Sequence, residues 1–323
     1  MALVYGGPSG VDKDFAAAIG LVPKTDGANA VVPLEVHVGD LIIRSAAAAL
    51  STTPSYAQRV LGAPVICQLG EDVFDRLDVE IDFAHHRLAF RDPASVTMPG
   101  GATEVPLTER DGNRVVPLSI DGAPPAYFEL ELGNVIGPLL VTPSFAQTHG
   151  LFANHATSQR LSGPFEETVV SVDHLGFAGL DFPHTPIAIV PESQLPPASI
   201  TGGVGLPLLS KFRLIVDYPH DLLYAVPDPT AIAAPIPKDR IGMVLSRTAT
   251  TNGAFTVTFV APKSPAAAAG FVKGDAIASI DGKPFYAWPM AAILGFPMAD
   301  PGAAHTFTMA DGSVRRVTAA DFF

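Results

Sequence analysis

The stretch Leu69–Phe90, LGEDVFDRLDVEIDFAHHRLAF, has a second copy in the same chain. It aligns without a gap on Val204–Ala225, VGLPLLSKFRLIVDYPHDLLYA, at a constant shift of 135 positions. A chain that repeats a segment of this length repeats a structural unit, so the sequence predicts two copies of one fold. The positions that match best are Gly70 and Gly205, Arg76 and Lys211, Asp82 and Asp217, His85 and His220, and Leu88 and Leu223.

A second, shorter pair extends the repeat towards the amino terminus. The stretch DFAAAIGL, which starts at Asp14, aligns on SFAQTHGL, which starts at Ser144, at a shift of 130 positions. Each copy therefore contains a short helix that ends in Gly-Leu, followed by strands, a glycine turn and a closing hairpin.

The closing part of each copy alternates between apolar and polar residues. In DVEIDF, which starts at Asp78, the valine, isoleucine and phenylalanine face one way and the three acids face the other. FRLIVDY, which starts at Phe212, alternates in the same manner. These are expected to be half-buried β-strands, and AHHR and PHDL are expected to be tight turns into the strands LAF and LLYAV.

Composition restricts the fold and function classes. The 323 residues include 31 prolines and 29 glycines, which interrupt the chain at the spacing typical of a mainly β protein. The formal charge of -12 leaves no basic surface for nucleic acid or anionic membranes, and no apolar run is long enough for a membrane span. Cys67 is the single cysteine, so neither an internal disulfide nor a cysteine zinc cluster is expected.

The amino terminus, MALVYGGPSGVDKDF, lacks a basic segment followed by an apolar core, so no signal peptide is expected. The chain as given is expected to be cytoplasmic, and its compartment is left open. Nine histidines contain no HExxH or similarly close pair, and His85 and His86 point apart on a turn, so no metal site is expected. No cofactor is expected, because GGVGLPLL from Gly202 belongs to the repeat and lacks the helix and strand order of a nucleotide loop. Ser9 has no GxSxG context and no identifiable base, so a serine hydrolase is not expected.

Together, the segments VICQLGEDVFDRLDVEIDF and TGGVGLPLLSKFRLIVDY and the duplicated Gly-Leu helix resemble the bacterial retropepsin-like aspartyl proteases, in a double-lobed form with a PDZ domain. The resemblance covers nearly the whole chain. It implies a mainly β fold, with a two-lobed pepsin-like or retropepsin-like β-barrel body and a carboxy-terminal PDZ domain. The expected boundaries are lobe 1 at 1–100, lobe 2 at 101–228, a linker at 229–238 and the PDZ domain at 239–323. The linker is placed at the Pro-Ala stretch PTAIAAPIPKDR.

The third segment contains the most specific motif, SPAAAAGFVKGDAIASIDG from Ser264. A short helix over residues 266–269 is expected, with Ser264 as its cap and Pro265 at its first position. Gly270 ends the helix, and a turn at 274–275 leads into the strand AIASI. Resemblance to PDZ domains implies that the loop Ile241, Gly242, Met243 and Val244 receives the carboxylate of a peptide, with a structural role in docking as the alternative.

In this family each lobe contributes one aspartate of an Asp-Thr-Gly motif, and the two acids share a proton. In YFELELGNVIGPLLVTPSFAQTHGL, from Tyr127, Glu131 stands at that position in lobe 2. In lobe 1 the position falls on Leu3 or Val4, and neither can ionise. The sequence therefore lacks the aspartate dyad. The family's first lobe begins with one further strand, which implies either a reduced lobe or a start upstream.

Glu131 is the expected catalytic residue, with Tyr5 as a possible second proton donor. Gly133 and Asn134 in lobe 2, and Gly6 and Gly7 in lobe 1, are expected to let the backbone approach a bound substrate. A structural carboxylate at Glu131 and a core aromatic at Tyr5 are the alternatives.

Three functions remain open for this chain. The first is acid–base chemistry by Glu131, such as isomerisation or cyclisation, on a peptide or peptide-derived ligand between the lobes. The second is a pseudoprotease that binds peptides without reaction, and the third is residual aspartic-type peptidase activity. The expected partners are a peptide ligand and a peptide carboxyl terminus at the PDZ domain.

Overall fold

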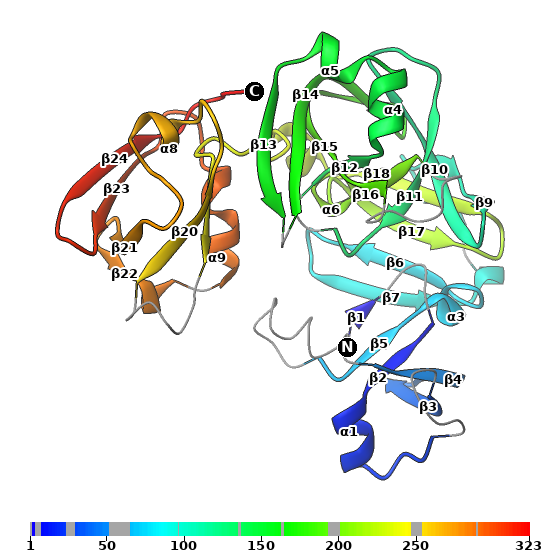
Figure 1. Ribbon diagram of the computed structural model, residues 1–323. Coiled ribbons are helices and arrows are strands. Elements are labelled where there is room, and N and C mark those ends of the chain that lie inside the picture. The colour runs from blue at the N-terminus through cyan, green and yellow to red at the C-terminus, as the bar shows by residue number, and fades with distance from the viewer. Residues whose placement is uncertain are drawn as a thin grey trace. The chain divides into compact units, whose positions relative to one another are not determined.

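The computed structural model describes residues 2–3, 8–23, 30–51, 65–95, 97–134, 137–162, 165–192, 201–246, 254–288 and 290–323. This part of the chain is mainly β and forms several sheets joined by short helices (Figure 1). The expected fold class is therefore confirmed. The candidate site residues Val4, Tyr5, Gly6 and Gly7 lie outside the described residues.

The chain divides into two compact units. The first contains Met1–Leu139, Leu175–Phe182 and Pro196–Pro235, and the second contains Leu140–His174, Pro183–Leu195 and Ile236–Phe323. The domain boundaries expected from the sequence stay a prediction.

One five-stranded sheet of the first unit is built from the amino-terminal residues. Its strand order is β1, β5, β2, β4, β3. The hairpin of β3 and β4 buries Val32 and Ala48 on the same core as Val11, and the edges of the hairpin remain exposed. The bounds are β1 Ala2–Leu3, β2 Gly10–Asp12, β3 Val31–Val38, β4 Leu41–Ser51 and β5 Cys67–Leu69.

The duplicated helix has the same bounds in both copies once the shift is applied. Helix α1 spans Lys13–Ala18 and is capped by Asp12, while α4 spans Pro143–Thr148 and is capped by Thr142. Side-chain oxygens of both caps accept hydrogen bonds from backbone amides of the first turn, which helix starts otherwise leave unpaired. Both helices end before a glycine with positive φ, Gly20 and Gly150. The expected helix pair is confirmed.

The second five-stranded sheet contains the long repeat. Its strand order is β7, β6, β17, β18, β8. Short helices, α3 (Glu71–Phe74) and α6 (Leu206–Leu209), precede β6 and β17 and start at the matching glycines. The bounds are β6 Asp78–Asp82, β7 Arg87–Arg91, β8 Thr103–Pro106, β17 Phe212–Asp217 and β18 Leu222–Pro227.

The two copies pair with one another through an approximate two-fold axis. In the antiparallel ladder of β6 and β17, Glu80 lies opposite Ile215, its own counterpart in the repeat. Ile81 lies opposite Leu214 and Val79 opposite Val216, so each pairing is exchanged for the other by the shift of 135. This reciprocal pattern is that of an isologous contact, and it confirms that the stretches are copies of one unit.

The turns that follow these strands are also equivalent. His85 Nδ1 bonds the Asp82 carboxylate at 2.9 and 3.0 Å, and His220 Nδ1 bonds the Asp217 carboxylate at 2.8 and 2.9 Å. The backbone amides of both histidines donate to the same carboxylates at 3.1 Å. The repeated Asp-to-His spacing thus closes both turns.

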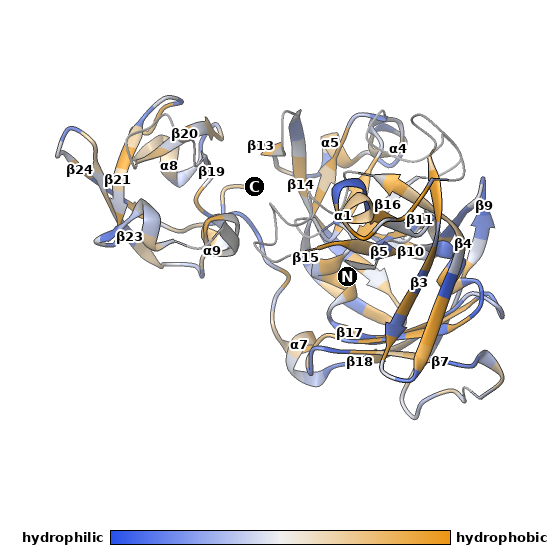
Figure 2. Ribbon diagram, turned by 90° about the horizontal axis from the view of Figure 1, so that it is seen from below, coloured by the Kyte–Doolittle hydropathy of each residue, from blue (hydrophilic) through white to orange (hydrophobic). Residues whose placement is uncertain are grey.

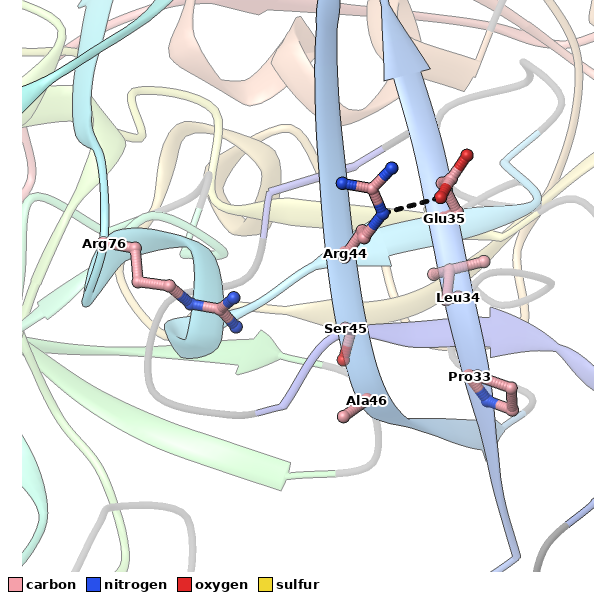
Figure 3. A pocket seen from close by; sticks show the side chains of 7 residues that line it. All are labelled: Pro33, Leu34, Glu35, Arg44, Ser45, Ala46 and Arg76. Atoms are coloured by element: carbon pink, nitrogen blue, oxygen red, sulfur yellow. Dashed lines mark hydrogen bonds and ion pairs between the residues drawn. The ribbon is translucent and has the colours of Figure 1, made fainter.

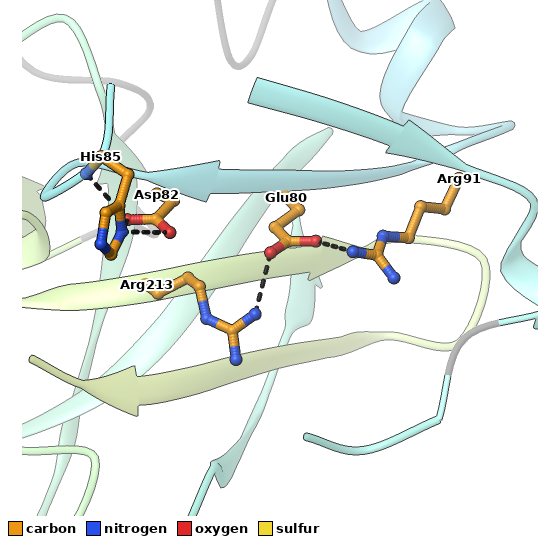
Figure 4. A network of polar contacts seen from close by, with 5 residues as sticks. All are labelled: Glu80, Asp82, His85, Arg91 and Arg213. Carbon is orange, nitrogen blue, oxygen red and sulfur yellow. Dashed lines mark hydrogen bonds and ion pairs between the residues drawn. The ribbon is translucent and has the colours of Figure 1, made fainter. Parts of the chain in front are cut away.

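The acid face of β6 is buried, contrary to the expected half-buried strand. Asp78 is 0% exposed and Glu80 is 4% exposed. The Glu80 carboxylate accepts hydrogen bonds from Arg213, at 2.9 Å, and from Arg91 (Figure 4). Alternation alone could not show this, because the partners come from the neighbouring strands β17 and β7.

The remaining strands of the first unit carry the candidate site. Strands β16, β11, β10 and β9 are neighbours in that order, and the end of β14 pairs with β10. Their core side chains are large and fully buried, including Phe128 and Leu130, whereas β9 at the edge is hydrophilic (Figure 2). The bounds are β9 Thr108–Arg110, β10 Asn113–Ile120, β11 Ala126–Glu131, β14 Phe165–Phe177 and β16 Gly202–Gly205.

A buried lysine of the first unit holds the chain that leaves the repeat. Helix α7 spans Pro229–Ala233, inside the stretch expected to be a linker. Lys211 is 5% exposed, and its Nζ donates to the carbonyl oxygens of Ala231 and Ala234, both at 2.7 Å. A cation at the carboxyl end of a helix satisfies carbonyls that have no partner within the helix.

In the second unit, β13, β14, β15 and β12 are neighbours in that order. Helix α5 (Leu151–Asn154) follows α4 and buries Leu151. The bounds are β12 Leu139–Val141, β13 Thr157–Ser162 and β15 Leu180–Ile189.

The last quarter of the chain forms a six-stranded sheet with its own hydrophobic core, which includes Phe255, Ile277 and Phe307. Helix α8 (Pro265–Ala268) is capped by Ser264, whose Oγ accepts from the Ala267 amide at 3.2 Å, so the expected helix is confirmed to within one residue. The other elements are β19 Met243–Ser246, β20 Phe255–Val260, β21 Ala276–Ile280, β22 Lys283–Pro284, β23 Ala304–Met309, β24 Val314–Thr318, α9 Met290–Gly295 and 3-10 turns at Pro93–Ser95, Phe285–Ala287 and Phe296–Met298.

Candidate active site

Glu131 is the last residue of β11, and its side chain is tied to the loop that follows. The Gly133 amide donates to Glu131 Oε1 at 2.8 Å, and the Asn134 amide donates to the Glu131 carbonyl at 3.2 Å. Glu131 is partly exposed, whereas its neighbour Leu130 is fully buried on the other face of the strand. The loop therefore positions one carboxylate oxygen at the end of a rigid strand.

Asn134 braces the other side of this loop. Its Nδ2 donates to the Gly137 carbonyl at 2.9 Å, and its Oδ1 accepts from the Gly137 amide at 3.0 Å. The Asn134 carbonyl accepts from the Leu206 amide at 2.8 Å, which connects the loop to the start of α6. Asn134, expected to contact substrate, thus has a structural duty in this loop.

Glycines of β16 lie beside the two acidic positions of β11. In this parallel pair Glu129 lies opposite Gly203 and Glu131 opposite Gly205. A Cβ atom at Gly205 would lie 2.1 Å from the Gly137 carbonyl oxygen, so this backbone approach requires glycine. The acidic face of β11 consequently has no side chain beside it from these two positions of β16.

The carboxyl groups on this face have shifted acidities. Burial raises the pKa of Glu131, although the hydrogen bond from the Gly133 amide opposes this shift. Burial and the nearby charge of Glu131 raise the pKa of Glu129 to about 7. Such a shift keeps a carboxyl group in exchange between its two forms near neutral pH, which acid–base chemistry requires.

Glu129 was not among the residues expected from the sequence. Its side chain is 7% exposed. The signal was present, because residues i and i+2 of a strand share a face and the segment ELE places two acids there. The motif of the resembling family has one acidic position on this strand, so the resemblance does not point to Glu129.

The first repeat contains the counterpart of this strand pair. β1 and β5 pair in parallel, with Ala2 opposite Gln68 and Leu3 opposite Leu69. The repeat shift matches Gln68 to Gly203, so Ala2 corresponds to Glu129. Counted two residues further along the sequence, Val4 corresponds to Glu131, and Val4 lies outside the described residues.

Buried carboxyl groups also meet in the repeat sheet. One step beyond the pairing of Val79 with Val216, Asp78 and Asp217 face each other across β6 and β17. Burial and the charge of Asp217 raise the pKa of Asp78 to about 7. The two aspartates are 0% and 2% exposed, so this pair is shielded from ligands.

The loop expected to bind a peptide carboxylate already contacts a carboxylate of the chain. Asp239 Oδ1 accepts hydrogen bonds from the amides of Ile241, at 2.9 Å, and Gly242, at 2.7 Å. Burial raises the pKa of Asp239 to about 6, against the effect of these two bonds. Met243 and Val244 lie in β19 and pair with Val260 and Phe259 of β20.

A shallow hollow of about 470 Å³ lies elsewhere in the first unit (Figure 3). Arg44 Nε of β4 is paired with the Glu35 carboxylate of β3 at 2.7 Å. Arg76, which follows α3, points towards the hollow from the other side. None of the residues expected to act as a site lies among its lining residues, which are Pro33, Leu34, Glu35, Arg44, Ser45, Ala46 and Arg76.

Within the described ranges, no three His, Cys, Asp or Glu side chains are arranged to hold a metal ion. In the same ranges, no helix combines the length and apolar character that a membrane crossing requires.

No protein-family model and no curated protein matches the chain. Among solved structures, a retropepsin-like aspartic protease from Rickettsia conorii aligns at 16% identity over 40% of this chain and 95% of that chain, with a TM-score of 0.29. An HtrA-type protease with a decapeptide aligns at 12% identity over 70% of this chain and 60% of that chain, with a TM-score of 0.24. Both are proteases, but superpositions with TM-scores below 0.5 do not establish the fold or the activity of this chain.

Proposed function

We propose that the chain binds a peptide or peptide-like molecule beside Glu131 and that Glu131 performs non-hydrolytic acid–base chemistry on it, such as isomerisation or cyclisation. The observation that carries this proposal is the placement of the Glu131 carboxyl group. It stands at the end of a buried strand, is fixed by the Gly133 amide at 2.8 Å, and has a pKa raised by burial.

The geometry assigns different tasks to the two oxygens of Glu131. Oε1 accepts the hydrogen bond from Gly133, which fixes the orientation of the carboxyl group. In the described part of the chain, Oε2 has no hydrogen-bond partner, so it is the oxygen that exchanges a proton with a ligand. General acid or base catalysis by a positioned side chain contributes typically 10²–10⁴-fold to a rate.

A peptide-like ligand fits the surroundings of Glu131. Gly203 of β16, opposite Glu129, has no side chain and lets a flat backbone approach the acidic face, whereas the space beside Gly205 is taken by the loop at Gly137. Peptide carbonyl groups accept a proton or hydrogen bond from a neutral carboxyl group, and this makes the hydrogens beside them more acidic. The aspartate dyad that peptide hydrolysis needs is missing, because Val4 occupies the matching position of the first repeat.

The test is Glu131→Gln, which preserves size and hydrogen bonding but removes the titrating proton. The ligand is first identified by mass spectrometry of molecules retained on the purified protein. Turnover of that molecule should fall on the order of 10²-fold or more, while its binding survives. Glu104→Gln, at an exposed glutamate of β8, is the matched control and should react as the unmodified protein does. Undiminished turnover by Glu131→Gln would remove Glu131 from the mechanism.

One observation favours a second function, a peptide-binding scaffold without chemistry. The hydrogen bond between Glu131 Oε1 and Gly133 gives the carboxylate a structural reason to be present. In that case Glu131→Gln changes affinity modestly and no reaction is lost. Residual peptidase activity has no supporting observation, because it requires the paired aspartates.

Peptide binding at the loop of Ile241 and Gly242 is a separate proposal. There a peptide carboxylate has to displace the Asp239 carboxylate, which occupies both amides. Among the described residues, no group of the chain occupies Glu131 Oε2 in this way, which is why the proposed chemistry is placed there.

A further inference from the structure

Glu129 and Glu131 are held side by side along β11. Two residues of a strand span ~6.6 Å, and their side chains point to the same face. The charge of Glu131 acts on the Glu129 carboxyl group, so the two groups are close enough to interact. Only 7% of Glu129 is exposed to solvent.

The neighbours of Glu129 on this sheet offer it no partner. Opposite Glu129 stand Val115 of β10 and Gly203 of β16. Neither side chain can donate a hydrogen bond, and Val115 is fully buried. Among the described residues, no cation or hydrogen-bond donor contacts the Glu129 carboxyl group. Burial of a carboxyl group costs stability unless a partner offsets it, and the described part of the chain supplies none, so a role in the Glu131 site accounts for its presence.

We propose that Glu129 is the second acid–base group of the Glu131 site, so that one strand supplies both the acid and the base that act on the ligand. This inference rests on the proposed function of Glu131 and deepens it. The two carboxyl groups hold one proton between them, because two like charges at this separation in a partly buried site are unfavourable.

The proton balance follows from this arrangement. The ionised carboxylate takes a proton from a C–H or N–H group beside a carbonyl of the ligand, and the electron pair left behind moves into the carbonyl group. The neutral carboxyl group gives its proton to the carbonyl oxygen. The pair ends with one proton, now on the other glutamate, so no further reactant is consumed. Both proton transfers occur on one side of the ligand. This arrangement favours tautomerisation or cyclisation, whereas inversion of a carbon centre uses two bases on opposite sides of the ligand.

The first test needs no ligand. Carboxyl ¹³C NMR of protein labelled at glutamate follows the titration midpoints of Glu129 and Glu131. Glu131→Gln removes the neighbouring charge and should lower the Glu129 midpoint on the order of one pH unit. Glu104→Gln should leave it unchanged. An unchanged Glu129 midpoint in Glu131→Gln would overturn the inference, whatever Glu131 does by itself.

The second test uses a small aryl epoxide as the probe. Its ring opens when a carboxylate attacks the carbon and a neighbouring carboxylic acid protonates the leaving oxygen, which leaves a hydroxyalkyl ester on the attacking glutamate. Unmodified protein should be labelled on the 127–134 segment with a bell-shaped pH dependence, measured by peptide mass spectrometry. Glu129→Gln should reduce labelling at least tenfold, and Glu129→Asp should restore part of it.

The outcomes separate this inference from the proposed function. Labelling of Glu129→Gln at the unmodified rate overturns the role of Glu129 and leaves Glu131 as a single acid. Absence of labelling in both the unmodified protein and Glu129→Asp overturns both proposals, since neither carboxyl group then reacts. Thermal unfolding shows whether each variant is folded. If Glu129→Gln does not fold, Glu129→Asp still tests the position, because it retains an acid there.

Discussion

At the scale of single residues, the two ends of the β6–β17 ladder differ in their electrostatics although they belong to one repeat. At one end Asp82 lies next to Arg213 and bonds His85. Burial alone would raise the pKa of Asp82, but the hydrogen bonds from His85 and the positive charges nearby lower it. At the other end Asp78 faces Asp217, and burial raises the pKa of Asp78 to about 7. The cause is one substitution between copies, since Asp78 corresponds to Arg213.

The raised pKa of Asp78 predicts a dependence of stability on pH. Above about pH 4 the unfolded chain releases the Asp78 proton, whereas the folded state retains it up to about pH 7. The stability that Asp78 contributes to the folded state is therefore complete below the unfolded pKa and is lost as the pH rises through about 7. Asp78→Asn keeps the neutral shape at every pH. Relative to the unmodified protein, this variant should gain thermal stability from pH 5 to pH 8, on the order of 2 kcal/mol.

The measurement is the thermal unfolding midpoint of both proteins at several pH values. Glu129 and Asp239 also have raised pKa values, so only the difference between variant and unmodified protein is diagnostic. Asp82→Asn is the matched control, because it removes a stabilised charge and should lower stability near neutral pH. A difference for Asp78→Asn that is independent of pH would contradict the paired-acid interpretation.

At the scale of elements, the glycines of β16 have unequal roles. The strand crosses beneath the loop of Asn134, and the Gly205 amide donates to the Pro138 carbonyl at 2.9 Å. At Gly203, by contrast, the atom nearest to an added Cβ is Glu131 Cβ, at 3.3 Å. Gly205 is therefore required by backbone contact, whereas Gly203 keeps the acidic face open.

Gly205→Ala should be strongly destabilising because its Cβ would overlap the Gly137 carbonyl at 2.1 Å, which is backbone and cannot rotate away. A loss of several kcal/mol is expected, on the order of 3 kcal/mol, as for other overpacked interior sites. Gly203→Ala, two residues earlier on the same strand, is the control and should cost less than half as much. Chemical denaturation measures the free energy of unfolding of both variants. Equal losses of stability in Gly205→Ala and Gly203→Ala would contradict the close contact between Gly205 and Gly137.

At the scale of the whole molecule, the two repeats carry different residues at the position of Glu131. Counted along the sequence, the residue of the first repeat that corresponds to Glu131 is Val4, which lies outside the described residues, and we propose on this basis that the chemistry implied by the resemblance is altered. Glu129 and Glu131 come from one strand, so they do not replace a pair of acids contributed by two repeats.

The purified chain should therefore leave casein and unfolded peptides intact between pH 3 and pH 5. Peptide mass spectrometry after prolonged incubation would detect cleavage products, with pepsin as the positive control. Pepstatin should have no effect on any activity that is found. Pepstatin-sensitive cleavage by the unmodified chain would show that a proton-sharing pair of aspartates forms elsewhere than at Glu131 and Val4.

Sequence alone determined the repeat, its strands and turns, and the cap of α8; the caps of α1 and α4 are of the same local kind. These features depend on residues within a few positions of one another: Asp12, Thr142 and Ser264 cap amides two or three residues away. The placement of Glu131 at the end of a strand also follows from its local pattern. Short-range chemistry of this kind is readable without a structure.

Tertiary structure alone decided the environment of the acids. Glu80 is buried because Arg213, which lies 133 positions away in the chain, supplies its counter-charge. Glu129 and Glu131 lie on one face of β11 beside Gly203, which comes from a strand more than 70 positions later in the chain. The pKa of a carboxyl group depends on desolvation and on charges brought near it by folding, and no local pattern contains that information.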